Sequence, residues 1–204
     1  MQSPSIPFAD KILQVARTFT QQGIPFAYGG AIARNYYAEP RLTLDLDVSI
    51  FLSPDAHVSV LCALQTLFPI PDTEDVINVV NRDGQVRVYW DATALDLFFS
   101  YDPFHSATAA RVRQAPYAGT TIPIHSPEDV ILHKLLFNRA KDWRDIVDML
   151  YTQQDAIDLV YILHWLSYFF PPDETRAEGD EEREDIRVRR FAGLVEAMRH
   201  PRGD

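Results

Sequence analysis

Apolar and polar positions along the first part of the chain predict alternating helices and strands. Helical spacing of apolar residues covers residues 7–22, and Gly23 and Pro25 end that helix. Period-two alternation, which is typical of half-buried strands, recurs further along. The predicted elements that follow are a strand at 26–28, a helix at 31–37, a strand at 44–52, a helix at 54–68, and strands at 76–81, 85–90, 94–100, 111–117 and 121–125. Asp83-Gly84 is the predicted hairpin turn between the strands at 76–81 and 85–90.

The pattern changes to helices alone near residue 126. Ser126-Pro127-Glu128-Asp129 combines an N-cap, a first-turn proline and an acid at the capping-box position, which predicts a helix start. That helix is expected to end near Phe137. Further helices are predicted at 141–151, 155–170 and 186–198.

Residues 171–185 are strongly charged and nearly free of apolar side chains, which predicts a mobile acidic loop. The whole pattern predicts an α+β fold in two parts. Residues 1–125 would form a mixed β-sheet with flanking helices, and residues 126–204 would form a helical region.

Composition narrows the classes of function. The chain has 204 residues, of which 47% are hydrophobic, so it can bury a core. Its formal net charge of -10 disfavours broad, non-specific binding of nucleic acid. Cys62 is the one cysteine and lies in an apolar run, where we expect it to be buried. Without an internal disulfide, a signal-peptide pattern or an apolar run of about 20 residues, we expect a cytoplasmic protein with no membrane partner.

Two aspartates interrupt the predicted strand at 44–52. Side chains at positions i and i+2 of a strand point to the same face, so Asp45 and Asp47 share one face. Leu44, Leu46 and Val48 share the other face, which can pack into the core. Asp96 stands among apolar residues of the strand at 94–100 in the same way. If the two strands are neighbours, three carboxylates converge.

The charge repulsion between converged carboxylates must be compensated. Two unit charges about 4 Å apart repel by roughly 4 kcal/mol at an effective dielectric constant of 20. A converged triad would therefore hold either protons or cations. Carboxylate oxygens are hard ligands that suit Mg²⁺ or Mn²⁺, and such ions can stabilise the attacking and leaving oxygens of a phosphoryl or nucleotidyl displacement.

A glycine pair precedes the aspartates. Gly29-Gly30 lies between a predicted strand and a predicted helix, where glycine lets the backbone approach a ligand closely and a helix N-terminus favours phosphate. Taken singly, the glycine pair is more often a turn, and an Asp-x-Asp on a strand is more often a solvated face. The combination of strand, Gly-Gly, helix, Asp-x-Asp and a later third acid is more specific.

These residues resemble the nucleotidyltransferase superfamily with the DNA polymerase β-like fold. Its signature is a hydrophobic residue with Gly-Gly, then Asp-x-Asp on the next strand and a third acid later. The matching positions are Tyr28, Gly29, Gly30, Asp45, Asp47 and Asp96, although Asp91 competes for the last place. Arg41 and Thr43 complete an R-x-T-x-D-x-D pattern that looks most like the bacterial AbiEii-type branch.

The helical part extends the same resemblance. It is similar to a region of that branch in which a helix with a lysine precedes R-x-K-D-x-x-D, here Lys134, Arg139, Lys141, Asp142 and Asp145. The resemblance implies that Lys134 meets nucleotide phosphates and that Asp145 supports the site. Without it, Lys134 would be interpreted as a solvated helix lysine. Asp142 and Asp145 could equally pair with Arg139 and Lys141, or cap a helix.

The resemblance implies a metal-dependent transfer of a nucleoside monophosphate from an NTP to an acceptor hydroxyl, with release of pyrophosphate. Asp45, Asp47 and Asp96 would be the catalytic and metal-binding residues. Gly29, Gly30, Arg41, Thr43, Lys134 and Asp145 would bind the nucleotide.

Several points stay open at the level of the sequence. The acceptor could be a tRNA, a protein or a small molecule, and a toxin-antitoxin-like setting, a partner protein or a homo-oligomer is possible. The alternatives are a non-catalytic binding or regulatory module with the same fold and, less favoured, a metal-dependent phosphohydrolase.

Overall fold

A computed structural model describes residues 6–70, 73–175 and 185–199 of the chain. The chain divides into two compact units. Unit 1 comprises Met1–Tyr36 and Arg41–Ser126, and unit 2 comprises Tyr37–Pro40 and Pro127–Asp204. The hydrophobic pattern does not predict that residues 37–40 belong to unit 2 while the residues on either side belong to unit 1. Within unit 2 this segment is fixed by a hydrogen bond from Gln153 Nε2 to the Tyr37 carbonyl oxygen (2.9 Å).

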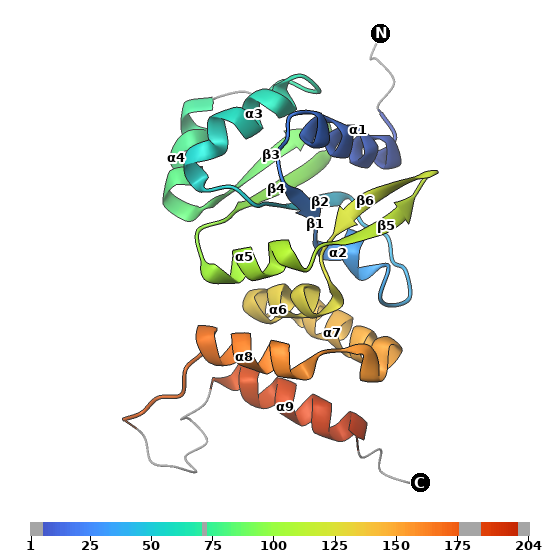
Figure 1. Cartoon of the computed structure of the whole chain (residues 1–204), viewed down its shortest axis with the longest axis vertical. Coiled ribbons are helices and arrows are strands. Elements are labelled where there is room, and N and C mark those ends of the chain that lie inside the picture. Colours follow the sequence, from blue (N-terminus) through green and yellow to red (C-terminus); the bar gives the residue numbers. More distant parts are fainter. Residues whose placement is uncertain (1–5, 71–72, 176–184, 200–204) are drawn as a thin grey trace. The chain divides into compact units, whose positions relative to one another are not determined.

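Unit 1 is built on a six-stranded mixed sheet (Figure 1). Its strands are β1 (Phe26–Tyr28), β2 (Asp45–Ile50), β3 (Gln85–Trp90), β4 (Thr93–Phe99), β5 (Arg113–Tyr117) and β6 (Thr120–Ile124), in the spatial order β3-β4-β2-β1-β6-β5. β2 pairs with β4, and β1 with β6, in parallel, and the other neighbours are antiparallel. The expected α+β class, a mixed sheet with flanking helices, is confirmed.

Helices cover one face of this sheet. Unit 1 contains α1 (Phe8–Gln21), α2 (Gly30–Arg34), α3 (His57–Gln65) after a 3-10 turn at Pro54–Ala56, α4 (Thr73–Asp83) and α5 (Pro103–Ala110). α1, α3 and α4 gather on the same side of the strands (Figure 1). The Tyr28 hydroxyl donates to the Ile12 carbonyl oxygen (2.6 Å), and Phe68 stacks on Trp90 at a centroid distance of 5.0 Å. The apolar side of the sheet is therefore the core of unit 1.

The predicted strand at 76–81 is wrong, because these residues belong to helix α4. Its run of β-branched residues is typical of a strand, but Glu74 and Asp75 at its start favour a helix N-terminus. Gly84, which we assigned to a hairpin turn, instead ends the helix. Its φ of +65° and its N–H bond to the Val80 carbonyl oxygen (2.8 Å) are typical of a helix C-terminus.

The hairpin turn lies elsewhere, at Asp91-Ala92. Trp90 pairs with Thr93 across it, and Asp91 has a φ of +52°. Lys11, which is buried on α1, holds this turn by donating to the Trp90 carbonyl oxygen (2.7 Å) and to Thr93 Oγ1 (3.1 Å). The predicted strands at 85–90 and 94–100 form the two arms of this hairpin.

Two further points separate the structure from the sequence pattern. Helix α5 was not predicted, although Asp102-Pro103 marks its start: the Asp102 carboxylate accepts a hydrogen bond from the Phe104 N–H (2.8 Å). Cys62, which we expected to be buried, is exposed on α3. The predicted pair at 111–117 and 121–125 is confirmed as β5 and β6, joined through Ala118 (φ +44°) and Gly119 (φ +81°).

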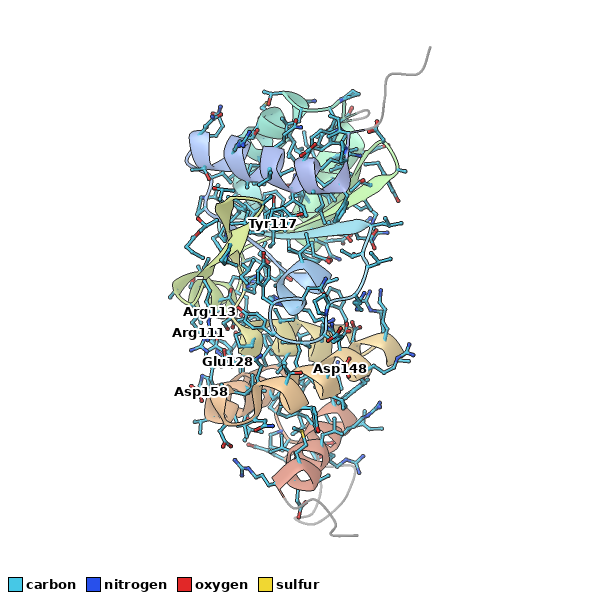
Figure 2. The ribbon with its side chains drawn as sticks, turned by 90° about the vertical axis from the view of Figure 1, so that its right-hand side faces the viewer. Arg111, Arg113, Tyr117, Glu128, Asp148 and Asp158 are labelled. Carbon is cyan, nitrogen blue, oxygen red and sulfur yellow. The ribbon has the colours of Figure 1, made fainter. Side chains whose placement is uncertain are left out.

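Within its described residues, the regular secondary structure of unit 2 is helical. It contains α6 (Pro127–Phe137), α7 (Ala140–Gln153), a 3-10 turn at Gln154–Ala156, α8 (Leu159–Phe169) and α9 (Ile186–Arg199). α6 packs against α7 and α8, and α7 packs against α9. Glu128 and Asp158, labelled in Figure 2, tie α6 to the start of α8, because the Glu128 carboxylate accepts from the Asp158 N–H (3.1 Å).

The predicted acidic loop at 171–185 lies largely outside the described residues, which resume at Asp185. None of the helices in the described segments combines the length and the apolar character that crossing a membrane requires.

Candidate active site

The pairing of β2 with β4 brings two of the predicted acids side by side. In this parallel pair Asp47 lies opposite Asp96, and Asp45 lies opposite Ala94. Neighbouring strands are about 4.8 Å apart, and residues opposite one another share a face. Leu46 and Val48 are fully buried and fix the other face of β2 in the core. The three carboxylates therefore occupy one face of the sheet, which we call the carboxylate face (Asp45, Asp47, Asp96).

Leu44 departs from the expected pattern. It precedes β2 and is exposed instead of packing beside Leu46 in the core. Asp45 is correspondingly exposed at the first position of the strand, whereas Asp47 is half-buried. The carboxylate face thus passes from open at Asp45 to more enclosed at Asp47.

The glycine pair contacts the carboxylate face directly. The Gly29 N–H donates to the Asp47 carbonyl oxygen (2.8 Å), so this N–H group extends the pairing of β1 with β2. Gly30 begins α2 with a φ of +48°, and a Cβ placed on it would overlap the Asp47 carboxylate. Only glycine satisfies both the left-handed conformation and the close approach. Gly29 and Gly30 are both expected to bind the nucleotide, but the Gly29 N–H is already used in the sheet.

His125 lies beside the glycines. It is fully buried, and its Nε2 makes a hydrogen bond with Ser49 Oγ (2.8 Å), two residues beyond Asp47 on the same face of β2. A Cβ on Gly29 would come within 3.3 Å of His125 Cδ2. The sequence gives this histidine no metal-ligand spacing, so its place beside the glycines could be found only from the fold.

Arg87 also lies on this face and was not predicted from the sequence. It lies opposite Asp96 across the β3–β4 pair and grips both carboxylate oxygens, Nε to Oδ1 and Nη2 to Oδ2, each at 2.7 Å. The Arg87 side chain is 51% exposed and that of Asp96 is 17% exposed. The bidentate hydrogen bonds and the charge of Asp96 raise the pKa of the Arg87 guanidinium.

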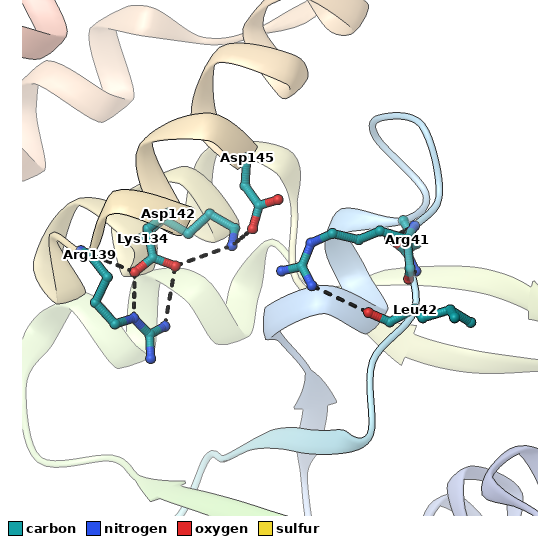
Figure 3. Close-up of polar contacts among 7 residues, drawn as sticks. Arg41, Leu42, Lys134, Arg139, Asp142 and Asp145 are labelled. Atoms are coloured by element: carbon teal, nitrogen blue, oxygen red, sulfur yellow. Dashed lines mark hydrogen bonds and ion pairs between the residues drawn. The ribbon is translucent and has the colours of Figure 1, made fainter.

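Arg41 and Thr43 shape the start of β2. The Asn35 side chain holds the Arg41 backbone, donating to its carbonyl oxygen (2.8 Å) and accepting from its N–H (3.0 Å). The Arg41 guanidinium donates to the Leu42 carbonyl oxygen at 3.4 Å (Figure 3). Thr43 Oγ1 accepts from the Asp45 N–H (3.3 Å). These contacts hold the chain that leads into Asp45.

The donor set fits a hard divalent cation in part. Among the described residues, no group of three or more His, Cys, Asp or Glu side chains is arranged to hold a metal ion. Mg²⁺ is usually bound through one or two carboxylates together with water and substrate phosphates, so a complete protein cage is not required. The paired Asp47 and Asp96, with Asp45 next along β2, offer ligands of that kind.

The predicted residues of unit 2 form an ion-pair cluster of their own. Lys134 Nζ lies 2.5 Å from Asp145 Oδ2 and 3.6 Å from Asp142 Oδ1, and Arg139 Nε lies 2.6 Å from Asp142 Oδ2 (Figure 3). The Lys134 side chain is only 7% exposed, so it is not a solvated helix lysine. Asp142 also accepts from the Arg139 N–H (3.2 Å) and caps α7. Pairing and capping, the alternatives to a site role for Asp142, are both present.

No family model and no curated protein matches the chain. Solved structures share its fold. The solution structure of the antibiotic-resistance factor ANT(2'')-Ia has a TM-score of 0.55 at 13% identity, over 79% of this chain and 92% of that one. The crystal structure of ANT(2")-Ia in complex with adenylyl-2"-tobramycin has a TM-score of 0.58 at 12% identity, over 79% and 98%. The lincosamide antibiotic adenylyltransferase LnuA is a weaker match, with a TM-score of 0.45.

At 12–13% sequence identity, the similarity to the two ANT(2")-Ia structures shows the fold alone. The chain has the nucleotidyltransferase fold that the resemblance implied, with its carboxylate face on β2 and β4.

Proposed function

We propose that this protein transfers a nucleoside monophosphate from an NTP to an acceptor hydroxyl and releases pyrophosphate. The observation that carries the proposal is the direct pairing of Asp47 with Asp96, with the Gly29-Gly30 backbone closing on Asp47. Fold alone would not support an activity, because one fold hosts many functions. The proposal therefore rests on this arrangement of residues within the nucleotidyltransferase fold.

Each residue of the carboxylate face has a part in the proposal. Asp45, Asp47 and Asp96 would hold Mg²⁺ or Mn²⁺, which when bound neutralises phosphate charge and lowers the pKa of the acceptor hydroxyl. Asp96, at the junction of β2, β3 and β4, would face that hydroxyl and accept its proton. Gly30 is the first residue of α2, so its N–H has no partner within that helix and would orient a phosphate.

Lys134 and Asp145 are left out of this mechanism. The resemblance expects Lys134 to meet phosphates, but Lys134 is buried and paired with Asp145 inside unit 2. In the proposal, Thr43 holds the backbone of Asp45, and Arg41, whose own backbone is held by Asn35, belongs to the segment that leads into Asp45. The AbiEii-type branch and the toxin-antitoxin-like setting stay predictions, which rest on the R-x-T-x-D-x-D pattern and on the similar helical region around Lys134 and Asp145.

A small hydroxyl-bearing molecule is the acceptor that we favour. ANT(2")-Ia, which shares the fold, was solved with adenylyl-2"-tobramycin, a nucleotidylated small molecule. The net charge of -10 opposes the approach of a tRNA. The proposed substrates are therefore an NTP and a small acceptor alcohol.

Thermal denaturation with nucleotide tests the binding half of the proposal. A ligand at 100 times its dissociation constant stabilises the folded state by about 2.7 kcal/mol. For a chain of this size we expect a rise in melting temperature of roughly 5–10 °C with at least one NTP and Mg²⁺. The double variant Asp45→Ala/Asp47→Ala should lose this rise.

Asp75→Asn is the matched control, because it removes one exposed carboxylate on α4 in the same unit. It should keep the full NTP-dependent rise. If none of the four NTPs with Mg²⁺ shifts the melting temperature of the unmodified chain, the nucleotide-binding claim is refuted.

One observation favours the non-catalytic alternative. The bidentate pair of Arg87 with Asp96 occupies both oxygens of the third acid. A binding module would keep that pair closed and would release neither pyrophosphate nor free nucleotide. A phosphohydrolase would release free nucleotide without an acceptor, so product analysis separates the three functions.

A further inference from the structure

Asp96, the third acid of the carboxylate face, already forms an ion pair with Arg87. Arg87 comes from β3, one of the two edge strands of the sheet, and its planar guanidinium matches the two oxygens of Asp96 at 2.7 Å each. Charge-assisted bidentate pairs of this geometry are the strongest kind of side-chain hydrogen bond. Asp96 therefore has a built-in counter-ion beside Asp47.

The pair can open without disturbing the core. The Arg87 side chain is half-exposed, whereas its neighbours Val86 and Val88 carry the core contacts of β3 on the opposite face. Because water reaches the half-exposed Arg87 side chain and can solvate the freed guanidinium, opening this pair costs less than breaking a buried one. An arginine stem beside water can swing away while the backbone of the hairpin stays in place.

A divalent cation on Asp96 would meet Arg87 directly. Both cations favour the same two carboxylate oxygens, and like charges at such short range repel. Asp47, opposite Asp96 in β2, strengthens the attraction for a dication but does not contact Arg87 in register, since β4 lies between β3 and β2. The Arg87 guanidinium and a metal ion therefore compete for the Asp96 carboxylate.

We propose that Arg87 is a latch on the carboxylate face, which competes with a divalent cation for Asp96 and must release Asp96 before the third acid can act. This inference rests on the proposed function, whose metal-dependent step it regulates. Arg87 is thus a positioning residue: it acts through Asp96 and sets how much metal ion the site requires.

Titration of Mn²⁺ into the full chain, with free Mn²⁺ followed by electron paramagnetic resonance, tests the latch without an activity assay. Arg87→Gln should bind Mn²⁺ at least about threefold more tightly, the factor that corresponds to an ordinary half-exposed ion pair. Arg87→Lys keeps the charge but loses the bidentate hydrogen bonds, so its affinity for Mn²⁺ should lie between those of the unmodified chain and Arg87→Gln. Asp96→Asn should remove the difference between Arg87 and its glutamine variant.

Arg82→Gln is the matched control, because Arg82 makes a similar pair with Asp83 on α4 (2.7 Å). It should leave the Mn²⁺ affinity unchanged. If Asp45→Ala/Asp47→Ala loses Mn²⁺ but Arg87→Gln binds it no more tightly than the unmodified chain, the latch is refuted while the metal site stands. If Mn²⁺ binding does not depend on Asp45 and Asp47 at all, the proposed function fails and the latch fails with it.

Discussion

Gly30 fixes the distance between the start of α2 and the carboxylate face. Its φ of +48° lies in the left-handed region, and a side chain there would overlap the Asp47 carboxylate. Gly30→Ala therefore carries two penalties, a backbone strain of about 1–2 kcal/mol and a displaced Asp47. We expect the variant to fold with reduced stability and to lose NTP binding, measured as the loss of the Mg²⁺- and NTP-dependent rise in melting temperature.

Gly119 offers a control for the strain alone. It has a φ of +81° in the β5–β6 turn, and a Cβ there meets nothing within 4 Å. Gly119→Ala should lower the melting temperature by a similar amount and keep NTP binding. Full NTP binding by Gly30→Ala would show that the contact with Asp47 does not position the site.

At the scale of elements, the pairing of α6 with α7 depends on a buried charge. Lys134 is enclosed with Asp145 and Asp142 nearby, and removing one partner of a buried pair leaves an uncompensated charge. We expect Lys134→Met to lower the free energy of unfolding by about 3–5 kcal/mol, measured by chemical denaturation. Lys134→Met/Asp145→Leu should recover part of this loss, because an apolar pair replaces the ion pair.

Lys141→Met on the exposed surface of α7 is the control and should change stability by less than about 0.5 kcal/mol. If Lys134 instead binds nucleotide phosphates, as the resemblance implies, the effects of Lys134→Met on stability and on NTP affinity are reversed. In that case, Lys134→Met would keep its stability and lose NTP affinity.

The sequence predicts elements of this chain well where periodicity and turn chemistry agree. β2 follows from strict alternation, β4 follows from an apolar run that Asp96 interrupts, and α6 follows from its capping residues. α4 was assigned to a strand because its β-branched residues are typical of one, but the segment is a helix with Glu74 and Asp75 in its first turn and Val80 fully buried. In such segments tertiary packing overrides local preference.

Because residues 76–84 were assigned to a strand and a hairpin turn, Arg87 was not predicted to lie beside Asp96. The hairpin turn at Asp91-Ala92 sets the register that places Arg87 opposite Asp96. Assigning the turn to Asp83-Gly84 left no reason to pair the two residues. The carboxylates could be predicted because they share a strand period, whereas their counter-ion depends on a turn position that only the folded hairpin reveals.

At the scale of the whole molecule, the acidic charge bears on the acceptor. A formal charge of -10 repels polyanions at long range, and this repulsion opposes an RNA acceptor more than a small neutral or cationic one. We expect label from a nucleotide to enter small molecules in preference to RNA. The ionic strength should be kept near physiological values, because low salt exaggerates the repulsion.

The most direct measurement follows the transferred group itself. The full chain would be incubated with Mg²⁺, a cell extract and each NTP labelled at its α-phosphate, and pyrophosphate and labelled products would be quantified together. We expect equal amounts of pyrophosphate and labelled acceptor from the unmodified chain and from Asp75→Asn, and neither product from Asp47→Asn. Absence of both products with all four NTPs, or free nucleotide in place of a labelled acceptor, would contradict the proposed function.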